Sequence, residues 1–295
     1  MAGAQRIALG SIAVGLGVLA LKGVAWRLTG SAALFSDAAE TVVNVAAGVI
    51  ALGALRLAAR PADANHPYGH DKAEVFAAVI EGALIVLAAG MIVQHAWLVW
   101  RHPAPLDMPL AGMALNALAT LANAGWALVL LRRGRALRSA ALRADGQHLL
   151  TDVITSAGVL IGVALVVVTG VAWLDPLLAA LTAAYILVAG LRVIGESVGG
   201  LMDAAPADAI VRRIRHLLGE AASGALEAHD LRVRAAGRQT YMEFDLVVPG
   251  SMTVADAHTI CDRIESALKA EIEGLVVTIH VEPEGKAKHH GVIVV

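Results

Sequence analysis

The polar stretch Arg143-Ala-Asp-Gly-Gln-His-Leu-Leu-Thr-Asp152 leads directly into a charge-free run, Val153–Val168. The run has the composition of the body of a membrane helix, yet its leading end carries Asp145, His148 and Asp152. Spacings of three and four residues place these side chains on one helical face. Ionisable groups in a membrane span are expensive and by default line a polar pathway or pair with other groups. A His and an Asp one turn apart can bind a divalent cation; the alternative is a helix end in which both hydrogen-bond to neighbouring helices.

The composition indicates a membrane protein with a soluble part. Hydrophobic residues make up 58 % of the chain and charged residues 16 %, against roughly 45–50 % and about 25 % in soluble domains. The single cysteine, Cys261, excludes a disulfide framework within one chain and any Cys-x-x-Cys metal site. The first apolar run, Ile7–Ala25, lacks a convincing cleavage site, so we expect a retained span. The net charge of -2 indicates no partner class, and we expect no nucleic acid among the partners.

Six apolar segments approach the ~20 residues that a membrane-spanning helix needs. They are Ile7–Leu28, Ala32–Leu57, Ala73–Trp100, Met108–Leu131, Ala140–Val168 and Leu174–Val193. The two long links between them, Arg56–Lys72 and Leu131–Arg143, are basic, whereas the three short links hold one Lys or Arg between them, Arg101. By the positive-inside rule the basic links lie in the cytoplasm. The sequence therefore predicts six spans with both termini in the cytoplasm.

After about Asp203 the pattern changes to that of a small soluble domain. Periodicity predicts two helices and three strands, with a turn at Ala236–Arg238 between the first two strands. The predicted elements are, in order, a helix over Ala207–Leu218, strands over Leu226–Arg234 and Thr240–Val248, a helix over Val254–Ala270 and a strand over Leu275–Val281. This order predicts an α+β domain with its helices on one face of a sheet.

The predicted fold class is thus a membrane bundle of six helices followed by a cytosolic α+β domain. We expect the membrane domain over residues 1–202, the cytosolic domain over 203–285 and a C-terminal tail over 286–295. The chain after Pro283 is expected to lack ordered structure.

The second span carries a polar stripe of Asp37, Glu40 and Asn44 on an otherwise apolar helix. Glu40 and Asn44 lie four residues apart, as do His148 and Asp152 in the fifth span. Two such pairs supply four nitrogen or oxygen ligands, which can enclose a divalent cation. The alternative is a seam of hydrogen bonds between helices.

Two further clusters lie outside the predicted spans. In the first long link, Asp63, His66 and His70 stand among Pro and Gly residues that turn the chain, and either a peripheral metal site or ordinary surface histidines would produce this pattern. The cytosolic domain holds five more potential ligands, for which chance occurrence on surface strands is the alternative. They are His229, Asp245, His258, His280 and Glu282.

These three clusters, in this order, resemble those of the cation diffusion facilitator family of proton-coupled metal exporters, and the likeness covers nearly the whole chain. The stretch Arg143–Asp152 fits the family's fifth-span motif. The link Pro61-Ala-Asp-Ala-Asn-His-Pro-Tyr-Gly-His-Asp-Lys-Ala-Glu74 is similar to that of the bacterial zinc and iron branch.

The resemblance implies roles for residues outside the spans. Asp63, His66 and His70 would form a peripheral metal site, and Lys72 and Asp203 would form a charge interlock. The family's cytosolic domain is metallochaperone-like (ferredoxin-like), forms homodimers and binds metal between protomers. The five cytosolic candidates fall on or near its ligand positions, Asp245 and Glu282 by substitution. The candidates are His229, Asp245, His258, His280 and Glu282.

The second span departs from the family pattern, because Glu40 and Asn44 stand where two carboxylates, or a histidine and a carboxylate, are usual. A site of two carboxylates, one amide and one imidazole is harder than a His-rich zinc site. It leans toward Fe²⁺, Mn²⁺ or Co²⁺ and leaves Zn²⁺ open; with the resemblance, Fe²⁺ or Zn²⁺ comes first. Asp37 and Asp145 are further candidate ligands.

The expected function is export of this ion from the cytoplasm by alternating access, in a bacterial inner membrane and in exchange for protons. Metal binding requires a neutral His148, so protons compete with the metal at this residue, and Glu40 is a second candidate carrier. Two alternatives stay open. A non-transporting sensor or partner subunit would result if Asn44 has disabled transport. The second is a membrane metalloenzyme, although the chain contains no His-Glu-x-x-His motif.

Overall fold

The computed structural model describes residues 2–102, 105–136, 140–237, 239–289 and 292–293. Within them, side chains are described except at 2–6, 8, 134–136, 140–145, 147 and 292–293. The chain forms two compact units. The first comprises Met1–Gly53 and Ala77–Ile194, and the second comprises Ala54–Phe76 and Gly195–Val295.

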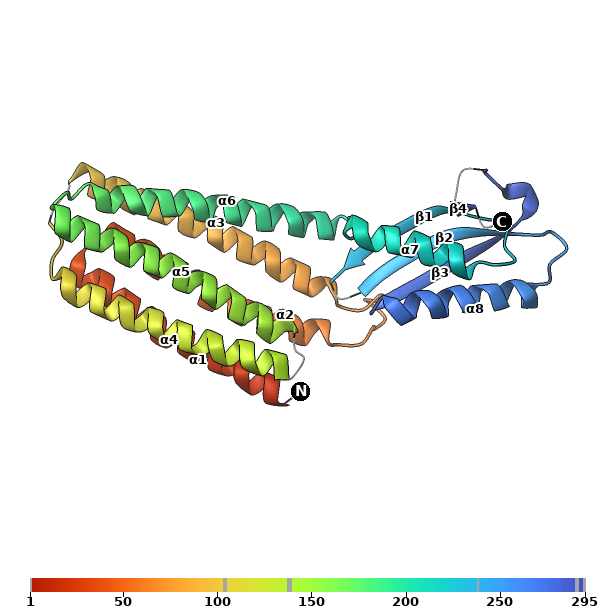
Figure 1. The fold of residues 1–295 in the computed structure, drawn as a ribbon, viewed down its shortest axis with the longest axis horizontal. Coiled ribbons are helices and arrows are strands. Elements are labelled where there is room, and N and C mark those ends of the chain that lie inside the picture. Colours follow the sequence, from red (N-terminus) through yellow and green to blue (C-terminus); the bar gives the residue numbers. More distant parts are fainter. Residues whose placement is uncertain (1, 103–104, 137–139, 238, 290–291, 294–295) are drawn as a thin grey trace. The chain divides into compact units, whose positions relative to one another are not determined.

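Six long helices dominate the chain (Figure 1). They are α1 (Ala2–Thr29), α2 (Ala32–Ala58), α3 (Lys72–Arg101), α4 (Pro109–Ala136), α5 (Ala140–Thr169) and α6 (Leu174–Leu201). All six contain a stretch long and apolar enough to cross a membrane, which confirms the predicted spans. Helix α6 continues past the predicted end at Val193, because hydropathy marks the apolar part of a helix and not the point where its backbone hydrogen bonds stop.

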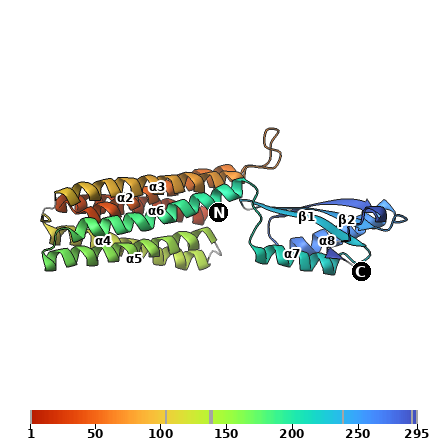
Figure 2. The ribbon, with the colours of Figure 1, turned by 90° about the horizontal axis from the view of Figure 1, so that it is seen from above.

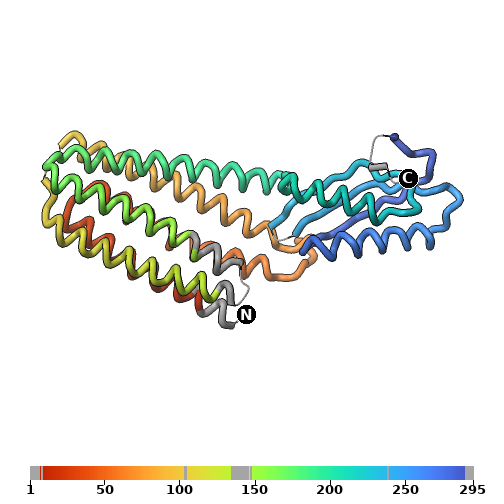
Figure 3. Tube along the Cα trace, in the orientation of Figure 1, coloured from red at the N-terminus to blue at the C-terminus, as the bar shows by residue number. Residues whose placement is uncertain are grey.

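Within the first unit, α4 packs against both α1 and α5 (Figure 3). Glycines permit close crossings between helices. A Cβ added at Gly82 of α3 would lie 2.7 Å from the Ile194 side chain of α6, and one at Gly190 would lie 2.7 Å from Ile85. Without a hydrophobic driving force between helices in lipid, such close packing carries much of their association. The abundance of Gly and Ala in the spans therefore reflects helix packing.

A buried carboxylate fixes the start of α2, the helix that carries Glu40 and Asn44. Asp175 of α6 accepts hydrogen bonds from the backbone N–H groups of Ala32 and Ala33 at 2.5 and 3.2 Å, and from the Ser31 hydroxyl at 2.5 Å. A negative charge at a helix N-terminus satisfies its unpaired donors and interacts favourably with the helix dipole. This contact anchors α2 against α6.

The second unit contains a sheet with two helices on one side (Figure 2). Its elements are α7 (Asp208–Ala221), β1 (Glu227–Ala236), β2 (Gln239–Val248), α8 (Val254–Glu271), β3 (Leu275–Pro283), a 3-10 turn η1 (Glu284–Lys286) and β4 (Val292–Ile293). Ile214, Leu218 and Ile264 of the helices are fully buried against Met242 and Leu246 of β2. The predicted α-β-β-α-β order is confirmed.

The strand order is β3-β2-β1-β4. Strands β1 and β2 form an antiparallel hairpin, whereas β2 and β3 are parallel because α8 carries the chain back across the sheet. Along β1, a bulge between His229 and Arg232 interrupts the register, and Asp230 adopts a positive φ of 53° there. Bulges commonly re-aim side chains near functional sites.

The expectation of no ordered structure after Pro283 is wrong for the described part of the tail. Val292 and Ile293 form β4 and pair with Ala228 and Glu227 of β1. Lys288 donates a hydrogen bond to the Asp230 carboxylate at 2.5 Å. The outer edge of β1 needs a partner for its backbone groups, and the strand β4 supplies one.

Candidate metal sites

The first site lies between α2 and α5. The Asn44 amide Nδ2 donates a hydrogen bond to Oδ2 of Asp152 at 2.7 Å, and Nε2 of His148 lies 4.0 Å from Oδ1 of the same carboxylate. Asp152 is buried, whereas the His148 side chain is half exposed. Glu40 lies one turn before Asn44 on α2, within electrostatic range of Asp152. The structure thus brings Asn44, His148 and Asp152 together, and Glu40 lies one helical turn away on α2.

The donor set of this site suits a divalent cation. It contains two carboxylates, one imidazole and one amide, all of which offer nitrogen or oxygen ligands. Because the Asn44 hydrogen bond uses Nδ2, its amide oxygen is not engaged in that bond. Asn44 can therefore orient Asp152 and still offer Oδ1 to a cation.

Asp37, the further candidate ligand on α2, makes a different contact. Its Oδ1 lies 2.8 Å from the Lys22 ammonium of α1 and accepts a hydrogen bond from the Ser156 hydroxyl of α5 at 2.7 Å. Sequence reasoning missed Lys22, although a lone lysine in an apolar span calls for a counter-charge. The other candidate, Asp145, lies outside the described side chains.

The second site lies in the loop between α2 and α3. Asp63, His66 and His70 each offer a ligand atom, and these atoms lie within 4.8 Å of one another. The Asp63 carboxylate is 3.2 Å from Nδ1 of His66 and 3.5 Å from Nε2 of His70. A hydrogen bond from the His66 backbone N–H is the largest influence that holds the pKa of Asp63 below its ordinary value. The cluster therefore keeps an ionised carboxylate between two imidazoles.

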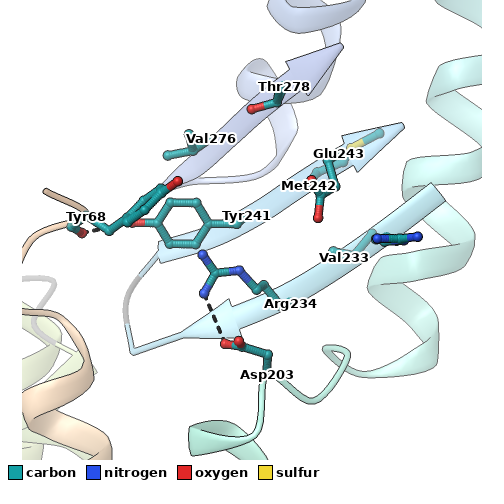
Figure 4. Close-up of a pocket in the computed structure, with 10 residues that line it drawn as sticks. Tyr68, Asp203, Val233, Arg234, Tyr241, Met242, Glu243, Val276 and Thr278 are labelled. Carbon is teal, nitrogen blue, oxygen red and sulfur yellow. Dashed lines mark hydrogen bonds and ion pairs between the residues drawn. The ribbon is translucent and has the colours of Figure 1, made fainter. Parts of the chain in front are cut away.

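Next to this loop, Lys72 and Asp203 form the predicted pair, with Nζ 2.9 Å from Oδ1. Arg234 of β1 joins them, its Nη1 lying 3.0 Å from the same oxygen (Figure 4). Both cations, Lys72 first, hold the pKa of Asp203 below its ordinary value. Arg234 also lies over the Tyr241 ring at 4.4 Å, and the Tyr241 hydroxyl donates to the backbone carbonyl of Tyr68 at 3.0 Å.

The third site centres on His229, a buried histidine of β1. Its Nε2 lies 3.7 Å from Oδ2 of Asp245 and 3.5 Å from Oε2 of Glu282. Neither of its ring nitrogens has a hydrogen bond among the described residues. His280, which is exposed, lies 3.8 Å from Glu282. An imidazole without hydrogen bonds among carboxylates fits a cation with nitrogen and oxygen ligands.

Two residues change the predicted third cluster. His258 lies on α8, where its Nε2 is 3.6 Å from Oδ1 of Asp262, and it is absent from the His229 group among the described residues. Asp230, which sequence reasoning missed, places a carboxylate oxygen within 4.8 Å of ligand atoms of His229 and Asp245. The bulge in β1 produces this proximity, and no sequence pattern signals it.

Both parts of the chain match domains of one protein family. Residues 8–202 match the cation efflux transmembrane domain, and residues 206–284 match the cytoplasmic domain of cation efflux proteins. The chain belongs to the cation efflux family. The predicted resemblance to the cation diffusion facilitators is thereby confirmed. The family is one of transporters and not of enzymes.

Two similar proteins agree with this assignment over most of the chain. A transporter of Synechocystis sp. is 42 % identical over 280 residues, which cover 95 % of this chain and 90 % of that protein. The cation-efflux pump FieF of Shewanella oneidensis is 30 % identical over 273 residues, which cover 92 % of each chain. A solved structure of CzrB in its zinc form is 48 % identical, covers 28 % of this chain and 96 % of its own, and has a TM-score of 0.28.

Proposed function

We propose that this cation efflux protein exports a divalent transition-metal ion from the cytoplasm through the site of Glu40, Asn44, His148 and Asp152, in exchange for protons. The observation that carries the proposal is the buried Asp152 carboxylate, which lies in a membrane span beside the Asn44 amide and the His148 imidazole. An ionisable group at such a position marks an ion pathway by default.

The ion is Fe²⁺ or Zn²⁺ first, with Mn²⁺ or Co²⁺ as further candidates. Two carboxylates and an amide favour the harder ions, and the single imidazole suits iron and zinc alike. The pump FieF of Shewanella oneidensis is named for cation efflux and leaves the ion open in the same way.

Proton coupling follows from competition at the ligands. The metal binds a neutral imidazole and ionised carboxylates, so each loading step displaces protons from the same atoms. We assign the proton to His148, because a proton and the metal compete for the same imidazole nitrogen. Alternating access then exposes the loaded site to the outside, where the proton gradient drives release of the metal.

The peripheral sites serve regulation in this proposal. The loop site of Asp63, His66 and His70 and the site around His229 bind cytosolic metal, and two copies of the chain associate through their cytosolic domains. The protein lies in a bacterial inner membrane with both termini in the cytoplasm, an orientation that the basic links support. The sensor alternative, in which Asn44 has disabled transport, is an outcome of the following test.

The test is metal flux into proteoliposomes under an imposed pH gradient, with Zn²⁺, Fe²⁺, Mn²⁺, Co²⁺ and Cd²⁺ as probes. We expect gradient-driven flux of one or two of these ions, lost in Asp152→Ala and His148→Ala. His216→Ala is the matched control, because this histidine is exposed on α7 and pairs with Glu220 at 3.2 Å. A folded protein that binds metal but carries none of the ions would overturn the proposal in favour of a sensor.

A further inference from the structure

A buried lysine stands at the centre of the first unit. Lys22 of α1 is 2 % exposed, and its ammonium donates to Oδ1 of Asp37 at 2.8 Å and to the Ser156 hydroxyl at 2.9 Å. The Ser156 hydroxyl in turn donates to the same Asp37 oxygen at 2.7 Å. Three helices, α1, α2 and α5, thus contribute one residue each to a closed polar network.

The network lies one helical turn from the proposed transport site. Asp37 precedes Glu40 by three residues on α2, and Ser156 follows Asp152 by four residues on α5. The Lys22 charge lies within electrostatic range of both Glu40 and Asp152. A change of charge at Lys22 will therefore be felt at both carboxylate ligands.

The charges that the structure describes in this region sum to the value that a divalent ion neutralises. Among the described side chains, Asp37, Glu40 and Asp152 contribute three negative charges when ionised, and Lys22 contributes one positive charge, which leaves two negative charges. Among the described residues of the first unit, Lys22–Asp37 is the one ion pair between a Lys or Arg and a carboxylate. Uncompensated charge is expensive in a buried region within lipid, so a matched total favours occupation by M²⁺.

The paired state of Asp37 also affects which groups bind the metal. Oδ1 of Asp37 is held by an ammonium and a hydroxyl, while Oδ2 has no hydrogen bond among the described residues. A carboxylate held in this way has its charge already neutralised. It is therefore a weaker ligand than the Asp152 carboxylate, which accepts a hydrogen bond from the neutral Asn44 amide.

We propose that Lys22 is a specificity-determining residue of the transport site: it neutralises Asp37, removes this carboxylate from the ligand set and sets the charge that a divalent cation balances. The inference rests on the proposed function, since it assigns a role beside the same site. It makes Lys22 a positioning residue, which acts on the metal through charge and without contact.

A double-mutant cycle in the full-length protein tests this role. Lys22→Met leaves three negative charges, Asp37→Asn leaves one, and the double variant Lys22→Met/Asp37→Asn restores two. We expect Asp37→Asn to lower the flux of Zn²⁺ and of Fe²⁺ because it weakens metal binding, and Lys22→Met to lower it because tighter binding slows release. Each effect is about tenfold or more, the effect of one unit charge roughly 10 Å away at an effective dielectric constant of about 20. The double variant is expected to recover flux to within about threefold of wild type.

A second readout separates charge from structure. Inhibition of flux by Tb³⁺, a trivalent probe, is expected to strengthen in Lys22→Met and to weaken in Asp37→Asn, and to return to the wild-type level in the double variant. Lys269→Met on α8 is the matched control for the Lys-to-Met change, because Lys269 is half exposed and pairs with Glu265 on the same helix.

The outcomes distinguish a charge-balancing role of Lys22 from a purely structural one. Recovery in the double variant supports the inference, also when a single variant fails to fold, because the imbalance then acts on stability. A double variant that fails to fold or to transport overturns it and makes Asp37 a ligand or Lys22 a specific structural group. Wild-type protein that carries none of Zn²⁺, Fe²⁺, Mn²⁺ and Co²⁺ refutes the proposed function instead, so the two failures are distinguishable.

Discussion

Replacement of Asn44 by leucine removes the hydrogen bond that holds Asp152. The bond joins a neutral amide to a buried carboxylate at 2.7 Å. A hydrogen bond to a charged group contributes about 1.5–3 kcal/mol, which corresponds to a change in metal affinity of about 10- to 150-fold. Loss of the amide oxygen as a ligand adds to this effect, so we expect Asn44→Leu to raise the metal concentration for half-maximal flux at least about tenfold.

The assay is initial Zn²⁺ and Fe²⁺ flux in proteoliposomes over a range of metal concentrations. Asn123→Leu is the matched control for the Asn-to-Leu change, because Asn123 is a buried amide on α4 and lies outside the proposed ligand set. We expect the control to keep the wild-type concentration dependence. An Asn44→Leu protein with the same half-maximal concentration as wild type would refute the assignment of Asn44 to the transport site.

Three further outcomes follow from the structure. Lys72 and Arg234 lower the pKa of Asp203 in the folded protein. The stability that this pairing contributes is therefore present above about pH 4, the ordinary aspartate range, and is lost as the pH falls through the lower folded-state pKa. The melting temperature of Asp203→Asn should accordingly lie below that of wild type at about pH 7, and the difference should vanish at about pH 3. Gly82→Val should lower the thermal stability of the detergent-solubilised protein, because its Cβ would lie 2.7 Å from an α6 side chain. His229→Ala should reduce the rise in melting temperature caused by Zn²⁺, whereas His258→Ala, which changes an exposed residue of α8, should not.

Hydrophobic patterning predicted the six helices and the order of the cytosolic elements, because both depend on periodicity along the chain. The sequence predicts an end at Val193, whereas α6 runs to Leu201, because polar residues end a membrane span without ending a helix. The tail strand was missed because two residues, Val292 and Ile293, form no recognisable pattern until β1 offers an edge.

The candidate ligands on single helices or loops could be predicted because their spacing determines which side chains share a face. Glu40 with Asn44 and His148 with Asp152 belong to this class. The Lys22–Asp37 pair could not be assigned, since the choice among several carboxylates depends on which helices pack together. Asp230 reaches the His229 cluster only through a bulge.

The most direct test of the account records metal and proton movement together in one population of vesicles. Wild-type protein in proteoliposomes that contain a pH-sensitive dye is supplied with Zn²⁺ or Fe²⁺ and no initial pH gradient. We expect metal entry to move protons in the opposite direction and Asp152→Ala to abolish both signals. Metal entry without proton movement, or metal-dependent proton movement that persists in Asp152→Ala, would contradict it.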